Sequence, residues 1–231
     1  PADAYEQSRV TRMEHVNTTI VETPKEGIAT VAARIATLIN RRNANGQKTI
    51  LSLASGRTMR DLYAELVRLH KEEGLSFKNV VIFGSYEFYP LSDTTSGSMA
   101  QIQSQLLDHI DILPENVHTF PGDLPKENVF AFCEEYEKAI AEAGGIDVQV
   151  LGIGQCGNIA MNEPGTQSNS STRLVIMDGN SRVDVKSLFG NVAQVPTCAI
   201  TLGIETILQA KEVILLAFGQ HKAGIIKQAI E

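Results

Sequence analysis

Short apolar runs alternate with longer amphipathic runs along the chain, and this alternation limits the folds open to it. The short runs are rich in β-branched residues, as buried strands are, whereas the longer runs repeat their apolar residues at helical spacing. Strands that are apolar throughout and separated by helices form a mainly parallel sheet with helices on both faces. Because no repeat, low-complexity segment or linker divides residues 1–231, we predict a single α/β domain.

The expected elements follow in regular order. Residues 23–26, Thr-Pro-Lys-Glu, form a capping-box sequence, so the first helix should begin there and run to about residue 43. We predict strands at residues 16–21, 48–54, 79–83, 117–120, 146–153, 172–177 and 212–218. We predict further helices from residue 58, at residues 98–107, 126–143, 184–189 and 205–210, and from residues 219–222.

Charge and cysteine usage narrow the class of protein. The net charge is −7 and no run of five like charges occurs, which argues against a nucleic-acid partner. No apolar run approaches the length of a membrane span, and the first residues lack the features of a signal peptide. The cysteines, Cys133, Cys156 and Cys198, lie far apart without metal-ligand spacing. We therefore expect a cytoplasmic protein without a cofactor, a metal site or a membrane partner.

The first candidate site follows the strand at residues 146–153. Gly152, Gly154 and Gly157 end this strand abruptly, and Glu163 follows on the same loop. In open α/β sheets, ligands bind beyond the carboxyl ends of the strands, and glycines there let the backbone approach an anion closely. The alternative is a glycine-rich turn with one solvated glutamate, and this stretch alone does not decide between the two.

The second candidate site joins the strand at residues 48–54 to the next helix. Its residues are Ser55, Gly56, Arg57 and Thr58. Two hydroxyls, a guanidinium and the free amides of a helix N-terminus can together hold a phosphate. The simpler alternative is that Ser55 or Thr58 only caps the helix.

A third polar loop, residues 84–90, is expected after the strand at residues 79–83. It contains a glycine, a carboxylate and three aromatic residues. This composition is compatible with a sugar pocket, although such loops are common.

Four segments together resemble the glucosamine-6-phosphate deaminase (isomerase) family, over about residues 16–231. They are residues 53–58, 86–91, 152–164 and 219–223. The tripeptide Asn-Glu-Pro that ends at Pro164 is the most specific, and it favours the deaminases over the related 6-phosphogluconolactonases. The resemblance implies a Rossmann-like fold, a sugar-phosphate pocket at the strand ends, no metal, and an aldose-ketose isomerisation coupled to loss of ammonia. Family members usually continue with another strand and helix, which we expect to be missing after Glu231.

The resemblance also assigns a phosphate site. It places this site on the loop Ser55, Gly56, Arg57 and Thr58, on Lys222, and on Lys186, where the family has an arginine. Lysine supplies the charge of arginine but not its two-pronged hydrogen bonding.

Two departures from the family pattern concern the catalytic groups. Tyr86 stands where the family has the aspartate that moves a proton between C2 and C1, and Asn158 stands where it has the histidine that opens the sugar ring. A tyrosine with an ordinary pKa near 10 is a poor base at neutral pH, and asparagine has no titratable proton. Loss of one positioned acid or base typically lowers the rate about 10²- to 10⁴-fold. Although Glu163 is kept, little isomerase activity should remain.

Neighbouring side chains are candidates to replace the missing groups. Glu87 adjoins Tyr86, but consecutive strand residues usually point in opposite directions. Cys156, often an aspartate in the family, is either a reactive thiolate or a small thiol that fills space. His221 lies beside Lys222 and is the one histidine expected near the pocket.

Three functions therefore stay open. The first is a weak or inactive deaminase that still binds a phosphorylated sugar, as a sensor or regulator. The second is an enzyme of altered reaction, of isomerase or lactonase type, that uses Glu163 with Cys156 or Glu87 on a related sugar phosphate. The third is a non-catalytic interaction module. The expected small-molecule partner is a sugar phosphate, and assembly into a homo-oligomer is compatible with the family.

Overall fold

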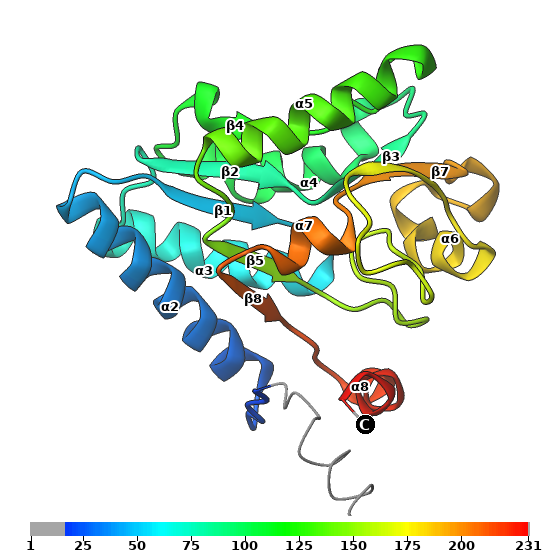
Figure 1. The fold of residues 1–231 in the computed structure, drawn as a ribbon. Coiled ribbons are helices and arrows are strands. Elements are labelled where there is room, and N and C mark those ends of the chain that lie inside the picture. Colours follow the sequence, from blue (N-terminus) through cyan, green and yellow to red (C-terminus); the bar gives the residue numbers. More distant parts are fainter. Residues whose placement is uncertain (1–16, 231) are drawn as a thin grey trace, which may run out of the picture.

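The computed structural model describes residues 17–230, which form a parallel sheet flanked by helices and a smaller second sheet (Figure 1). The strands are β1 (Thr49–Leu53), β2 (Val80–Gly84), β3 (Tyr86–Tyr89), β4 (Val117–His118), β5 (Val148–Leu151), β6 (Arg173–Ile176), β7 (Cys198–Thr201) and β8 (Glu212–Leu215). The first sheet has the order β4-β2-β1-β5-β8, and all its neighbouring pairs are parallel. The second sheet has the order β3-β7-β6 and is antiparallel.

Some helices cover the two faces of the parallel sheet, whereas others lie beside the smaller sheet or near the end of the chain (Figure 1). The α-helices are α2 (Pro24–Ala44), α3 (Arg57–Glu73), α4 (Ser98–Gln105), α5 (Val129–Glu142), α6 (Gly179–Val185), α7 (Ile204–Leu208) and α8 (Ala223–Ile230). Short 3-10 turns lie at Thr94–Ser96, Leu107–His109, Pro114–Asn116, Lys126–Asn128, Lys186–Leu188, Val192–Gln194 and Gln220–Lys222. The predicted N-cap of α2 is confirmed, because the Glu26 amide donates to Thr23 Oγ1 at 3.2 Å. The second bond of a capping box differs: the Glu26 carboxylate accepts from the Glu22 amide at 3.2 Å instead of from the Thr23 amide.

Alternate residues of the buried strands pack into two layers of the core. In β1, Leu51 and Leu53 pack with α2, α3 and α4, whereas Ile50 packs with α5 and α7. Figure 1 shows α2 and α3 on one side of the sheet and α5 on the other. Strands buried on both faces need apolar residues on both faces, which explains the continuous apolar runs in the sequence. The predicted α/β fold, with a mainly parallel sheet covered on both faces, is confirmed.

The strand order sets where a ligand can bind. From β1 the chain continues to β2 and β4 on one side, and then returns to β5 and β8 on the other. The order therefore reverses between β1 and β5. The crevice outside the carboxyl ends of the strands at such a point is where open α/β sheets bind ligands. The loops that follow Leu53 and Leu151 flank this crevice.

Several predicted elements differ from the structure. Residues 17–21 form no strand, because the run pairs with no other strand and Ile20 is 93% exposed; residue 16 lies outside the described residues. The loop predicted at residues 84–90 is largely strand β3, because residues 86–89 pair with β7. The predicted strand near residues 172–177 exists as β6, but it belongs to the antiparallel sheet. The helix predicted at residues 184–189 is instead the end of α6 followed by a 3-10 turn.

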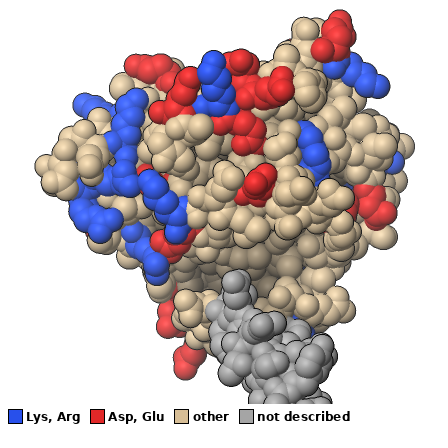
Figure 2. Space-filling view, viewed as in Figure 1, with Lys and Arg blue, Asp and Glu red and all other residues tan. Residues whose placement is uncertain are grey.

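One buried carboxylate joins three elements at the amino-terminal edge of the parallel sheet. The Asp147 side chain is 2% exposed, and its Oδ1 forms ion pairs with Arg42 at 2.6 Å and with Lys211 at 2.7 Å. Its Oδ2 accepts a hydrogen bond from the Ile50 amide at 2.9 Å. Positive side chains gather at this end of the molecule, on the left of Figure 2. Asp147 therefore ties α2, β1 and the segment before β8 together, far from the carboxyl-end loops.

Candidate functional site

The loop after β1 enters α3 through a glycine with an unusual backbone conformation. Gly56 has a φ of +130°, which side chains rarely allow, and it is the N-cap of α3. No side chain of residues 17–230 caps this helix, so the simpler alternative, in which Ser55 or Thr58 only caps it, is wrong. The first amides of a 17-residue helix are thus free of side-chain acceptors, and they carry the positive end of the helix dipole. Such an N-terminus can hold an anion.

Tyr86 reaches the same loop from β3. Its hydroxyl oxygen lies 2.7 Å from Ser55 Oγ and 3.5 Å from the Ser55 carbonyl oxygen. Burial raises the pKa of Tyr86 to about 12; the hydrogen bond with Ser55 opposes this rise, and the nearby Glu87 carboxylate adds to it. The phenol therefore stays protonated at neutral pH, where it cannot serve as a general base.

The loop after β5 folds back on itself. The Gly154 amide donates to the Asn158 carbonyl at 2.9 Å, and the Gly157 amide donates to the Gly154 carbonyl at 3.1 Å. A Cβ at Gly154 would collide with Asn158 Oδ1, so only glycine leaves room for this side chain. Positive φ angles of +89° at Gly157 and +51° at Ala160 complete the turn. The structure thereby places the Asn158 amide group directly over the backbone of Gly154.

A buried asparagine fixes the segment between this turn and Glu163. Asn162 is 2% exposed, and its Nδ2 donates to the carbonyl oxygens of Leu202 at 2.8 Å and Ile159 at 3.1 Å. The bond to Leu202 holds the loop against the end of β7, and the bond to Ile159 closes the loop on itself. The position of Glu163 is therefore set by the fold and not by a free loop.

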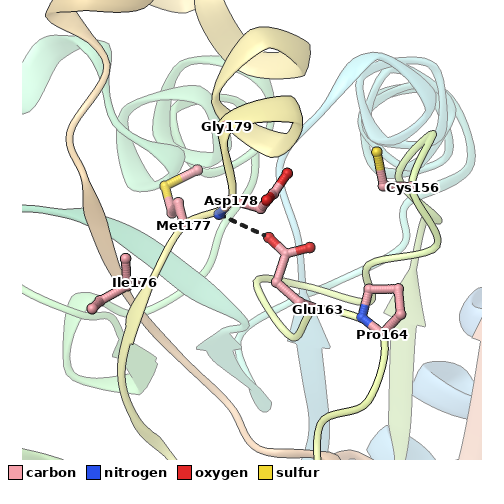
Figure 3. A pocket seen from close by; sticks show the side chains of 7 residues that line it. All are labelled: Cys156, Glu163, Pro164, Ile176, Met177, Asp178 and Gly179. Carbon is pink, nitrogen blue, oxygen red and sulfur yellow. Dashed lines mark hydrogen bonds between the residues drawn. The ribbon is translucent and has the colours of Figure 1, made fainter.

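An open cavity of about 570 Å³ lies where the loop after β5 meets the end of β6 (Figure 3). Figure 3 shows the Glu163 carboxylate turned toward Asp178, with Cys156 on the neighbouring loop segment. The cavity combines carboxylates and a thiol with apolar groups. Its lining residues are Cys156, Glu163, Pro164, Ile176, Met177, Asp178 and Gly179.

The two oxygens of Glu163 differ in their surroundings. Oε1 accepts hydrogen bonds from Ser181 Oγ at 2.7 Å and from the Asp178 amide at 3.3 Å. Oε2 has no hydrogen-bond partner within residues 17–230. One oxygen therefore positions the carboxylate, and the other can accept a hydrogen bond or a proton from a ligand.

The predicted cationic residues differ in placement. Lys222 donates from Nζ to the Ile153 carbonyl oxygen at 2.7 Å, so it lies at the exit of β5, beside the crevice. Lys186 and Arg57 are exposed, and neither lines the cavity. His221, beside Lys222, is also exposed. The structure thus brings Lys222 to the crevice, and it shows no contact that brings Lys186 or Arg57 there.

Glu87 points away from Tyr86 into the protein. It is 3% exposed, and its carboxylate accepts hydrogen bonds from the amides of Phe88, Ser98 and Met99 at 2.7–2.8 Å. Burial raises the pKa of this carboxyl group, and the three amides oppose the rise. Glu87 therefore holds the start of α4, and it does not line the cavity.

The last predicted site residue is Cys156. It is a free, half-buried cysteine in the cavity wall. Within residues 17–230, no group of three or more His, Cys, Asp or Glu side chains is placed to hold a metal ion. In the same range, no helix has the length and apolar character to cross a membrane.

Sequence reasoning missed the wall of the cavity that follows β6. Asp178 lines the cavity and also caps α6, because its Oδ1 accepts from the Asn180 amide at 2.8 Å. The available signal was an Asp-Gly pair directly after a predicted strand, which is typical of a turn at a strand exit. The loops after β1 and β5 were predicted as sites because they follow strands, and the same reason applies to the loop after β6.

Comparisons with known proteins place these features in a family. The model of the family described as glucosamine-6-phosphate isomerases/6-phosphogluconolactonase matches residues 22–231. A glucosamine-6-phosphate deaminase from Bacillus pumilus is 41% identical over 197 residues, which cover 83% of this chain and 79% of that protein. A glucosamine-6-phosphate deaminase-like protein from Bacteroides thetaiotaomicron is 44% identical over the whole chain, but the chain spans only 35% of that protein's length.

Solved structures give a matching result. A monomeric glucosamine-6-phosphate deaminase has a TM-score of 0.85 at 32% identity, covering 92% of this chain and 86% of that one. A 6-phosphogluconolactonase from Thermotoga maritima has a TM-score of 0.70 at 22% identity, covering 91% of this chain and 87% of that one. The second likeness shows a shared fold alone.

Proposed function

Because the chain belongs to the glucosamine-6-phosphate isomerase/6-phosphogluconolactonase family, we propose that it binds a sugar phosphate at the carboxyl edge of its parallel sheet but deaminates it weakly or not at all. The observation that carries the proposal is the N-terminus of α3, whose first amides donate to no side chain in the described part of the protein. This N-terminus lies at the crevice between β1 and β5, where the fold binds ligands. The phosphate would bind these amides and the Ser55 hydroxyl.

Lys222 supports the same location from the other side of the crevice. Its ammonium group lies within hydrogen-bond distance of the Ile153 carbonyl, at the exit of β5. An ammonium group keeps two further donors for a ligand after it makes that one bond. We propose that Lys222 contributes the positive charge of the phosphate site, with Arg57 and Lys186 as exposed cations that approach only when ligand is bound.

The weak turnover follows from two side chains. Tyr86 is a protonated phenol at neutral pH, and Asn158 offers an amide that can hold a sugar oxygen but cannot transfer a proton. Glu163 remains in the cavity with one unoccupied oxygen. A single carboxylate without its partner groups supports binding and slow proton transfer, but not the coupled steps of a deaminase.

A second candidate function is an altered reaction on a related sugar phosphate. Glu163 shares its cavity with Cys156 and Asp178, so a base, a thiol and a second carboxylate line one open space. This arrangement favours an enzyme in which Glu163 moves a proton with Cys156 beside it, rather than with Glu87, which does not line the cavity.

We also propose a cytoplasmic location for the protein. All three cysteines are free thiols, which fits a reducing compartment.

Calorimetric titration with fructose 6-phosphate and with fructose tests the phosphate site. We expect binding of fructose 6-phosphate and none of fructose, because the proposed contacts go to the phosphate group. Lys222→Met should weaken that binding at least about tenfold, since a hydrogen bond to a charged group contributes about 1.5–3 kcal/mol. Lys71→Met, in the last turn of α3, is the matched control and should bind normally. If wild type binds neither compound, the proposal is wrong and an interaction module becomes the better account.

A further inference from the structure

Tyr86 lies where it can orient the hydroxyl of Ser55, and we infer that it is a positioning residue of the phosphate site. The inference rests on the proposed function, because it concerns the same anion site at the start of α3. It assigns a role to a residue that the sequence resemblance alone would treat only as the replacement of a base. The role depends on the hydroxyl of Tyr86 and on the contact that this hydroxyl makes.

The hydrogen-bonding capacity of the two hydroxyls supports this role. Each has one proton to donate and can also accept, and the two oxygens lie 2.7 Å apart. If Tyr86 donates to Ser55 Oγ, the Ser55 proton is left to point at an anion on the α3 amides. The phenol is protonated at neutral pH, so it has that proton to give. An anion at the helix N-terminus favours donation from Tyr86 to Ser55 and from Ser55 to the anion, because hydrogen bonds in a chain polarise one another.

Packing holds the tyrosine ring in place for this purpose. The ring of Tyr86 contacts that of Phe88 edge-to-face, with centroids 5.7 Å apart. Phe88 is fully buried and in turn contacts Phe189 at 5.1 Å. A ring fixed in this way loses little freedom when a ligand binds, so the hydroxyl is pre-organised. The same aromatic row joins the β1 exit to the segment that carries Lys186, which ends at Phe189.

Tyr86→Phe tests the inference, because it removes the hydroxyl and keeps the ring. We expect the affinity for inorganic phosphate and for fructose 6-phosphate to fall about fivefold, the usual size for one hydrogen bond. Tyr89→Phe is the matched control: it makes the same chemical change in the same strand, at a hydroxyl that donates to the Leu124 carbonyl at 2.8 Å. The control should leave both affinities unchanged.

A double-mutant cycle tests whether Tyr86 acts through Ser55. In a Ser55→Ala background, adding Tyr86→Phe should cause no further loss of affinity. As an independent route, Ser55→Ala alone should weaken binding at least as much as Tyr86→Phe, while Ser55→Thr, which keeps a hydroxyl, should bind nearly as wild type. These Ser55 variants keep the test available if Tyr86→Phe fails to fold.

The outcomes separate this inference from the proposed function. If wild type binds phosphate and Tyr86→Phe or Ser55→Ala binds equally well, the inference is overturned while the sugar-phosphate function stands. Equal losses in Tyr86→Phe and Tyr89→Phe also overturn it, because they would reflect a general effect of removing a phenol from β3. If wild type binds neither compound, both the inference and the proposed function are overturned.

Discussion

Replacing Tyr86 with aspartate and Asn158 with histidine in one variant should raise the rate of ammonia release from glucosamine 6-phosphate by at least about 100-fold. A positioned general acid or base contributes about 10²- to 10⁴-fold, and the double change supplies two such groups. Tyr86 is held at the β1 exit, and Asn158 lies in the turn that leads to Glu163, so both new groups would border the proposed site. A coupled enzymatic assay for ammonia, compared with wild type at saturating substrate, gives the measurement.

The restored activity should depend on Glu163. Adding Glu163→Gln to the double variant should return the rate to the wild-type level, because the Glu163 oxygen that is free to take up a proton would be replaced by an amide group. Each single substitution should raise the rate of ammonia release much less than the double substitution, because the two groups act in successive steps on the same sugar. A double variant that folds, binds fructose 6-phosphate and stays inactive would show that the loss of activity has another cause than these two side chains. Weaker binding in that variant is expected, because aspartate cannot donate to Ser55.

Asp147→Ala should lower the free energy of unfolding by about 3 kcal/mol. Breaking a buried ion pair typically costs about 3–5 kcal/mol, because the remaining charge is left uncompensated. We expect the lower end of this energy range, because the Lys211 side chain is 56% exposed and its charge can turn to water. The Arg42 side chain is only 22% exposed, so its charge is the one left poorly compensated. The Ile50 amide would also lose its acceptor. Urea unfolding followed by circular dichroism measures the change.

The control for Asp147 is an exposed pair. Asp61 Oδ1 lies 3.3 Å from Arg60 Nε, and 57% of the Asp61 side chain is exposed. Asp61→Ala should therefore change the free energy of unfolding by less than about 1 kcal/mol. Since Asp147 lies at the amino-terminal edge, Asp147→Ala protein that remains folded should bind fructose 6-phosphate normally. Similar effects of the two substitutions would mean that the cluster around Asp147 contributes little to stability.

The parallel sheet was predictable because burial on both faces leaves a strong pattern. A continuous apolar run such as residues 80–83 of β2 is buried by packing alternate residues against helices on opposite faces of the sheet. The run that contains Ile20 is also rich in β-branched residues, but it has no partner strand within residues 17–230, and pairing between distant segments cannot be read from one segment. For the same reason β3 was predicted as a loop: its partner, β7, lies more than a hundred residues further on.

Parts of the candidate site were predictable to different degrees. The glycines after β5 and the Ser55 loop were identified because strand exits in this fold class are recognisable by their small residues. The contact between Tyr86 and Ser55 was not, since it depends on the antiparallel sheet that carries Tyr86. Asp178 was missed because the lining of a cavity depends on how α6 folds back toward Glu163. The opposite directions of Tyr86 and Glu87 agree with simple strand geometry.

Titration of the wild-type protein with glucosamine 6-phosphate, with released ammonia assayed in the same samples, distinguishes a sugar-phosphate-binding protein from an active deaminase. We expect saturable binding, with ammonia release at least about 100-fold slower than that of a deaminase with intact acid and base groups measured alongside. Saturable binding with rapid ammonia release would contradict it, because Tyr86 and Asn158 would then not have removed the acid-base chemistry, and Glu163 with Cys156 or Asp178 would have to supply it.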